Sequence, residues 1–159
     1  MIRVLVTHFS VTGNTEAMAD AVVKGVRSVE GVECQRKEVT EVTNDDLIEA
    51  DAIIVGSPTY FGQMAAEVKR MFDISERIYG KLEGKVGGAF TTAGGAGCGH
   101  ETTIMSIVTA MMVAGMVVQG TTKGPHFGPF AIGRPDGKAL AQAKNLGARV
   151  ATLARKLSS

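Results

Sequence analysis

Short apolar runs alternate with segments of helical periodicity along the whole chain. The first run, Ile2–Val6, is apolar apart from Arg3 and rich in branched side chains, which is typical of a strand buried on both faces. Apolar residues then recur at three- and four-residue spacing between Met18 and Val29, which predicts an amphipathic helix. The two patterns go on alternating to the end of the chain. Strands are expected at 2–6, 32–39, 52–55, 86–92 and 116–119, and helices near 18–29, from 43, from 65, at 100–114 and at 140–157.

This alternation predicts an α/β fold built on a mainly parallel sheet, with helices on both faces and right-handed crossovers. The sequence contains no internal repeat and no long linker, so residues 1–159 are expected to form a single domain. Ligands of such sheets bind beyond the carboxyl ends of the strands, near the point where the strand order reverses. Three loops of unusual composition leave those ends, at 9–15, 56–63 and 91–100, and we expect the site there.

Composition and charge narrow the function classes. Apolar residues make up 45% of the chain and charged residues 21%, which excludes a disordered protein. A formal net charge of +1 argues against electrostatic nucleic-acid binding and against a polybasic membrane anchor. The charge-free stretch between Glu101 and Lys123 is broken by Gly115 and by polar residues, which predicts a buried helix and strand and no membrane span. Two cysteines and an N-terminus that begins directly with a strand indicate a cytoplasmic protein with reduced thiols.

The loop after the first strand has the chemistry of a phosphate site. Between Phe9 and Thr15 it carries three hydroxyls, one amide and one glycine at the start of a helix. A helix N-terminus offers unpaired N–H groups and a partial positive charge, which suit a phosphate dianion. The alternative is a simple N-cap, but one cap needs only one such residue. Neither a P-loop motif nor a first-turn Rossmann glycine fingerprint is present.

The motif Ser10-Val11-Thr12-Gly13-Asn14-Thr15 resembles the FMN phosphate loop of the flavodoxin-like superfamily. The resemblance continues through Asp51–Gly62, which is similar to the second loop of the WrbA-type NAD(P)H:quinone oxidoreductases. Further similar pieces are Tyr79–Leu82, Phe90–Thr92 with its glycine-rich turn, and Gly115–Val117. The resemblance implies a flavodoxin-like sheet of five parallel strands in the order 2-1-3-4-5.

The resemblance also implies the cofactor and its contacts. FMN is expected, because a single helix-terminal loop serves one phosphate, whereas FAD has two. The residues implied are Ser10, Val11, Thr12, Gly13, Asn14 and Thr15 for the phosphate, Pro58, Thr59, Tyr60, Phe61 and Gly62 for the isoalloxazine, and Thr91, Thr92, Ala93, Gly94, Gly95 and Gly97 for its other edge. The flavin N5 carries the chemistry, so no side chain is assigned a catalytic role and no metal is expected.

Two functions follow from the resemblance. The first is two-electron reduction of quinones by NAD(P)H, and the alternative is one-electron transfer between redox proteins, as in a flavodoxin. Flavodoxins are typically acidic and hold the flavin between two aromatic residues, whereas this chain is near neutral and has no aromatic residue at 93–99. A flavin-free binding module of the same fold is a third class, and the intact phosphate loop argues against it.

The chain departs from the WrbA type at two places. Ile74–Tyr79 is too short for the family's insertion after the third helix, and Val113-Ala114 stand where that family usually has a histidine. These departures concern substrate choice and assembly and leave FMN binding unaffected. A homo-oligomer, dimer or tetramer, is implied, with the Met-rich helix 100–114 and the loop 120–137 as its surface.

Five further residues are candidates for a functional role. Cys98 and His100 are two ligands at most, which cannot build a tetrahedral metal site. His8, at the end of the first strand, is interpreted as structural, and Cys34 as buried and inert. His126 lies in a Gly/Pro-rich loop that can reach over the flavin, which makes it a candidate by loop context alone.

Overall fold

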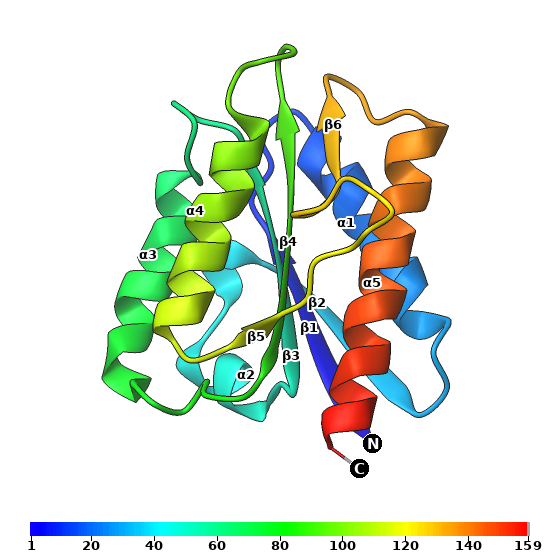
Figure 1. Cartoon of the computed structure of the whole chain (residues 1–159). Helices are drawn as coiled ribbons and strands as arrows, with labels where there is room; N and C mark the ends of the chain where they lie inside the picture. Colours follow the sequence, from blue (N-terminus) through cyan, green and yellow to red (C-terminus); the bar gives the residue numbers. More distant parts are fainter. Residues whose placement is uncertain (159) are drawn as a thin grey trace.

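Six parallel strands form one twisted sheet with helices on both faces (Figure 1). The computed structural model describes residues 1–158. The strands are β1 (Ile2–His8), β2 (Val32–Glu38), β3 (Ala52–Pro58), β4 (Val86–Ala93), β5 (Val117–Val118) and β6 (Phe130–Ile132). The helices are α1 (Asn14–Arg27), α2 (Asn44–Glu49), α3 (Ala66–Ile74), α4 (His100–Val113) and α5 (Gly137–Leu157), with 3-10 turns η1 (Val39–Glu41) and η2 (Ser75–Ile78).

The expected strand order is confirmed, since the sheet runs β2-β1-β3-β4-β5. The edge beyond β4 differs from the prediction of one strand at 116–119 followed by an irregular loop. There β5 pairs with β4 at Val86 and Gly87, and β6 pairs with the other end of β4, from Thr91 to Ala93. Strands β5 and β6 therefore lie end to end along the same edge of the sheet, and the segment 119–129 separates them. Periodicity could not reveal β6, because three residues are too few to display a period of two.

The alternation of side chains along the buried strands builds two separate cores. Val4 and Val6 point to the face covered by α1 and α5, and Leu5 between them points to the face covered by α2, α3 and α4. Strand β3 divides in the same way, with Ile54 on the first face and Ile53 on the second. Figure 1 shows α1 and α5 together on one side of the sheet, and α3 and α4 on the other. Within residues 1–158, no helix combines the length and the apolar character needed to cross a membrane.

The helices begin in two different ways, with or without a side-chain cap. Helix α2 starts with a capping box, in which Thr43 Oγ1 accepts from the N–H of Asp46 and the Asp46 carboxylate accepts from the N–H of Thr43. Helix α5 is capped by Asp136, which accepts from Ala139 N–H at 2.8 Å. Helices α1 and α4 have no side-chain cap, and each follows a glycine in the left-handed conformation, Gly13 or Gly99. Helix α3 also lacks a side-chain cap, and the residue before it is Ala65. Helices α1 and α4 follow the ends of β1 and β4.

Candidate functional site

Hydrogen bonds between threonines join the three expected loops at the carboxyl edge of the sheet. The Oγ1 atoms of Thr15 and Thr92 lie 2.8 Å apart, which connects the first loop to the third. The second loop is connected to the third twice, by the Oγ1 atoms of Thr59 and Thr91 at 3.0 Å and by Thr59 N–H donating to Thr92 O at 2.8 Å. These contacts fix the relative positions of loops that are far apart in the sequence.

The first loop leaves the start of α1 open. Gly13 has φ 89°, and no atom lies within 4 Å of where its Cβ would stand. Ser10 Oγ accepts from Gly13 N–H at 3.1 Å, so this serine orders the loop. None of the loop's hydroxyl or amide side chains caps the helix, and the N–H groups of its first turn have no partner within the helix. The simple N-cap interpretation is therefore less well supported than the phosphate interpretation, because no residue of the loop performs the cap.

The second loop presents two aromatic side chains on a tight turn. The backbone N–H and C=O groups of Tyr60 and Gln63 pair with each other, so Phe61 and Gly62 form the tip. Phe61 has φ 51°, a left-handed conformation that is unfavourable for a bulky residue, and its side chain is fully exposed. Such strain and exposure are common where an aromatic residue serves a binding site.

The third loop packs closely against the tip of the second. Gly99 has φ 94°, and a Cβ there would lie 2.7 Å from Gly62 Cα, so only glycine permits this approach. Residues 94–97 carry no side chain larger than a methyl group. This stretch of the third loop is thus built almost entirely of backbone, which offers N–H donors to a planar ligand.

The predicted site residues divide by depth. Thr15, Thr91, Thr92 and Ala93 are buried beneath the surface; Ser10, Gly13, Asn14, Pro58, Thr59, Gly62 and Gly95 are half-buried; Val11, Thr12, Tyr60, Phe61, Gly94 and Gly97 are exposed. All of them belong to the three loops or to the strand ends that carry these loops. The buried threonines hold the loops together, and the exposed residues can touch a ligand directly.

A cluster of charged residues surrounds the buried His8 at the end of β1, and the sequence analysis identified only His8. His8 is 1% exposed, and its Nε2 lies 3.0 Å from the Glu38 carboxylate. Burial lowers the pKa of His8, while Glu38 opposes that shift. Arg36 pairs with Glu16 and Asp20 in the first two turns of α1. The only signal in the sequence was the charge at alternate positions of β2, such as Arg36 and Glu38. Its meaning becomes clear only when β2 is placed beside β1.

The remaining candidates have structural explanations. His8, Glu16 and Glu38 lie close enough to share an ion, but the Arg36 guanidinium is 3.0 Å from Glu16 and 3.4 Å from His8 Nε2 and already balances that charge. The ring of His100 stacks on Phe130, with the centroids 4.0 Å apart. His126 Nδ1 is 2.8 Å from Thr121 O, a contact within its own loop.

The two cysteines differ in their surroundings. Cys34 is half-buried, and burial raises the pKa of its thiol to about 11. Cys98 is exposed in the glycine-rich loop. The inert character predicted for Cys34 agrees with its raised pKa, because the thiolate is the reactive form.

Sequence comparison gives both enzyme and carrier relatives. A family model described as NADPH-dependent FMN reductase matches residues 3–124. A flavodoxin from Aquifex aeolicus is 39% identical over 159 positions, covering 95% of this chain and 86% of that protein. An NAD(P)H dehydrogenase (quinone) from Gluconacetobacter diazotrophicus is 34% identical over 200 positions, covering 100% of both chains. Since this chain has 159 residues, at least 41 of those 200 positions have no counterpart in it.

Solved structures give the same fold. A flavodoxin, WrbA-like protein from Agrobacterium tumefaciens superposes with a TM-score of 0.84 at 27% identity, covering 98% of this chain and 99% of that one. A flavodoxin from the domain Archaea gives a TM-score of 0.80 at 29% identity, covering 97% and 99%.

Proposed function

Because this chain belongs to the NADPH-dependent FMN reductase family, within the flavodoxin-like superfamily, we propose that it is an FMN-dependent oxidoreductase that reduces quinones with NAD(P)H. The observation that carries the proposal is the edge where three loops meet beside two helix N-termini without side-chain caps. In this fold and family, the carboxyl edge of the sheet is the expected binding site for a flavin, and the residues found there suit FMN.

The start of α1 suits the phosphate of FMN. The backbone N–H groups of Thr12 and of the first turn of α1, together with the exposed hydroxyl of Thr12, supply donors, and Gly13 leaves room for close approach. Thr15 supports this loop from beneath through its bond to Thr92.

The second and third loops suit the isoalloxazine. Tyr60 and Phe61 offer aromatic faces, and the backbone of 94–97 offers donors to its polar edge. When bound, FMN supplies the hydride-accepting and hydride-donating atom. The residues of this chain position the ring and keep one face uncovered, because the glycine-rich wall has no bulky side chain. One open face that serves the donor and the acceptor in turn implies ping-pong kinetics.

The phosphate assignment is tested with Thr12→Glu. A carboxylate at this exposed position places a negative charge against the FMN phosphate, and we expect at least a tenfold loss of FMN affinity, about 1.4 kcal/mol. Thr15 is unsuitable for this test because it is buried, so an acid there would also disturb folding. Thr109→Glu, on the exposed surface of α4, is the control. Fluorescence titration of FMN gives the affinity, and equal binding by both variants would refute the assignment.

The reaction is tested by mixing FMN-loaded protein with NADH or NADPH and a water-soluble quinone. Catalytic oxidation of the dinucleotide, with parallel lines in double-reciprocal plots, is expected for an enzyme with one shared face. The flavodoxin names among the relatives favour the carrier as the second candidate. A carrier accepts electrons from a reductase protein and shows no turnover with NAD(P)H alone, so that result would replace the first proposal with the second.

The proposal also includes a homo-oligomer and a cytoplasmic location. The outer face of α4 exposes Met112 and Val113, at 64% and 68%, next to Tyr79 at 76%, and this apolar surface supports a homo-oligomer, dimer or tetramer. Two free cysteines support a cytoplasmic location. A monomeric mass in sedimentation analysis would contradict the assembly.

A further inference from the structure

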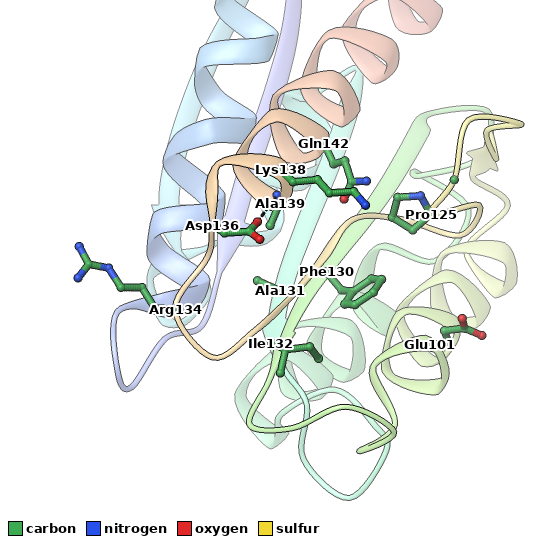
Figure 2. Close-up of a pocket in the computed structure, with 11 residues that line it drawn as sticks. Glu101, Pro125, Phe130, Ala131, Ile132, Arg134, Asp136, Lys138, Ala139 and Gln142 are labelled. Carbon is green, nitrogen blue, oxygen red and sulfur yellow. Dashed lines mark hydrogen bonds between the residues drawn. The ribbon is translucent and has the colours of Figure 1, made fainter.

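A cavity of about 500 Å³ lies beside the candidate flavin site and shares none of its predicted residues. Its walls are β6, the N-terminal turn of α5, the segment at Gly124 and Pro125, and Glu101 from α4 (Figure 2). The volume is within the range of small-molecule sites, about 300–1,000 Å³.

The sheet places this cavity next to the flavin loop. Strand β6 pairs with the end of β4, so Phe130 is opposite Thr91, and Ile132 is opposite Ala93. Paired strands lie about 4.8 Å apart. A ligand held against β6 is thus one strand spacing from the residues expected to hold the edge of the isoalloxazine.

The cavity lining combines three kinds of chemistry. Phe130, stacked on His100, and Pro125 give flat apolar surfaces. Lys138 and, at the rim, Arg134 give positive charge, and neither forms an ion pair with any other residue in 1–158. In Figure 2, Lys138 and Gln142 reach from α5 toward Pro125.

Two carboxylates also line the cavity, and they differ in availability. Asp136 accepts from Ala139 N–H as the cap of α5, so it is already engaged. Glu101 stands on the opposite wall and has no hydrogen-bond partner among the described residues. A free carboxylate opposite free cations suits a ligand with both hydroxyl and phosphate groups, since carboxylates commonly bind the ribose hydroxyls of dinucleotides.

We propose that this cavity binds the adenosine-phosphate half of the nicotinamide dinucleotide. Lys138, with Arg134 at the rim, binds phosphate, Glu101 accepts from ribose hydroxyls, and the adenine packs against Phe130 and Pro125. The nicotinamide end then extends across the β4 edge toward the flavin. The inference rests on the proposed function, because the dinucleotide is the electron donor in that reaction.

The test measures binding of a fragment that lacks the nicotinamide and cannot react. Adenosine 5′-diphosphate is titrated calorimetrically into the purified chain, its Lys138→Gln variant and a Lys144→Gln control. Lys144 is an exposed lysine on the same helix that does not line the cavity, so both variants lose one charge from α5. We expect about tenfold weaker binding for Lys138→Gln, the effect of one lost charge-assisted hydrogen bond. Lys144→Gln should bind like the wild type, and FMN affinity should be unchanged in both variants.

The outcomes separate this proposal from the function. Absence of fragment binding by the wild type, or equal binding by the two lysine variants, overturns the cavity assignment, whatever the turnover with quinone. Selective weakening in Lys138→Gln together with no NAD(P)H oxidation by the wild type supports the cavity and rejects the oxidoreductase function. Selective weakening together with a raised KM for the dinucleotide and an unchanged kcat supports both.

Discussion

Replacing Gly147 by alanine should destabilise the protein, because α5 touches α1 at this glycine. A Cβ at position 147 would lie 2.9 Å from Val26 N and 3.0 Å from Val22 C, and closer still to the Val22 carbonyl oxygen. Ordinary contacts of a Cβ begin at 3.4 Å. Every atom in the way belongs to backbone, so no side chain can rotate aside and the two helices must separate. On α1, Gly25 meets the backbone of Lys144 in the same manner.

The expected magnitude follows from two opposing effects. Overpacking of a well-filled interface costs about 1–3 kcal/mol, and a clash with backbone belongs at the upper end. Alanine has a higher helix propensity than glycine, which offsets about 1 kcal/mol. The net loss in the free energy of unfolding is about 2 kcal/mol, which lowers Tm by about 4–8 °C in a chain of this size.

The control for this prediction is Gly137→Ala at the start of the same helix. No atom lies within 4 Å of a Cβ there, so only the propensity effect remains and stability should stay equal or rise by up to about 1 kcal/mol. Urea unfolding followed by circular dichroism, with FMN absent, measures both variants. Wild-type stability or better in Gly147→Ala would show that the helices do not meet as described.

Three further predictions concern buried polar groups. Burial lowers the pKa of His8 below its ordinary 6.5, so the stability that neutral His8 contributes above pH 6.5 should be lost as the pH falls. The free energy of unfolding, measured with urea, should therefore be lower at pH 5 than at pH 7, and His8→Gln should remove the part of this difference that is due to His8. An unchanged difference in the variant would contradict the assignment. Burial raises the pKa of Cys34 to about 11, so a thiol reagent at pH 8 should modify one cysteine per native chain, Cys98, and two per unfolded chain; two in the native protein would refute this. The buried Ser57 hydroxyl accepts from Ala65 N–H at 2.8 Å, so Ser57→Ala should cost about 1–3 kcal/mol of stability, and a neutral result in thermal unfolding would mean that the N–H finds another partner.

The pattern of residues along the chain is enough to predict the layered architecture, and the family resemblance adds the strand order. Continuous apolar runs such as Ala52–Val55 predict strands that are buried on both faces of a sheet, and the helical periods between them require crossovers. The sequence also pointed to the three loops, because hydroxyls and glycines gathered where strands end. These are local signals, since spacing along the chain and residue type carry them.

Which loop residues are buried and which are exposed follows only from the three-dimensional contacts. Thr15 and Thr12 are alike in sequence, yet Thr15 is buried against Thr92, and Thr12 is exposed. The pairing of β6 with β4 and the cavity beside it depend on strands that meet across a long excursion of the chain. The cluster around His8 depends on the parallel register of β1 and β2, which places Glu38 opposite His8. Such contacts join residues distant in sequence, and their energies depend on distance and burial, which no local pattern contains.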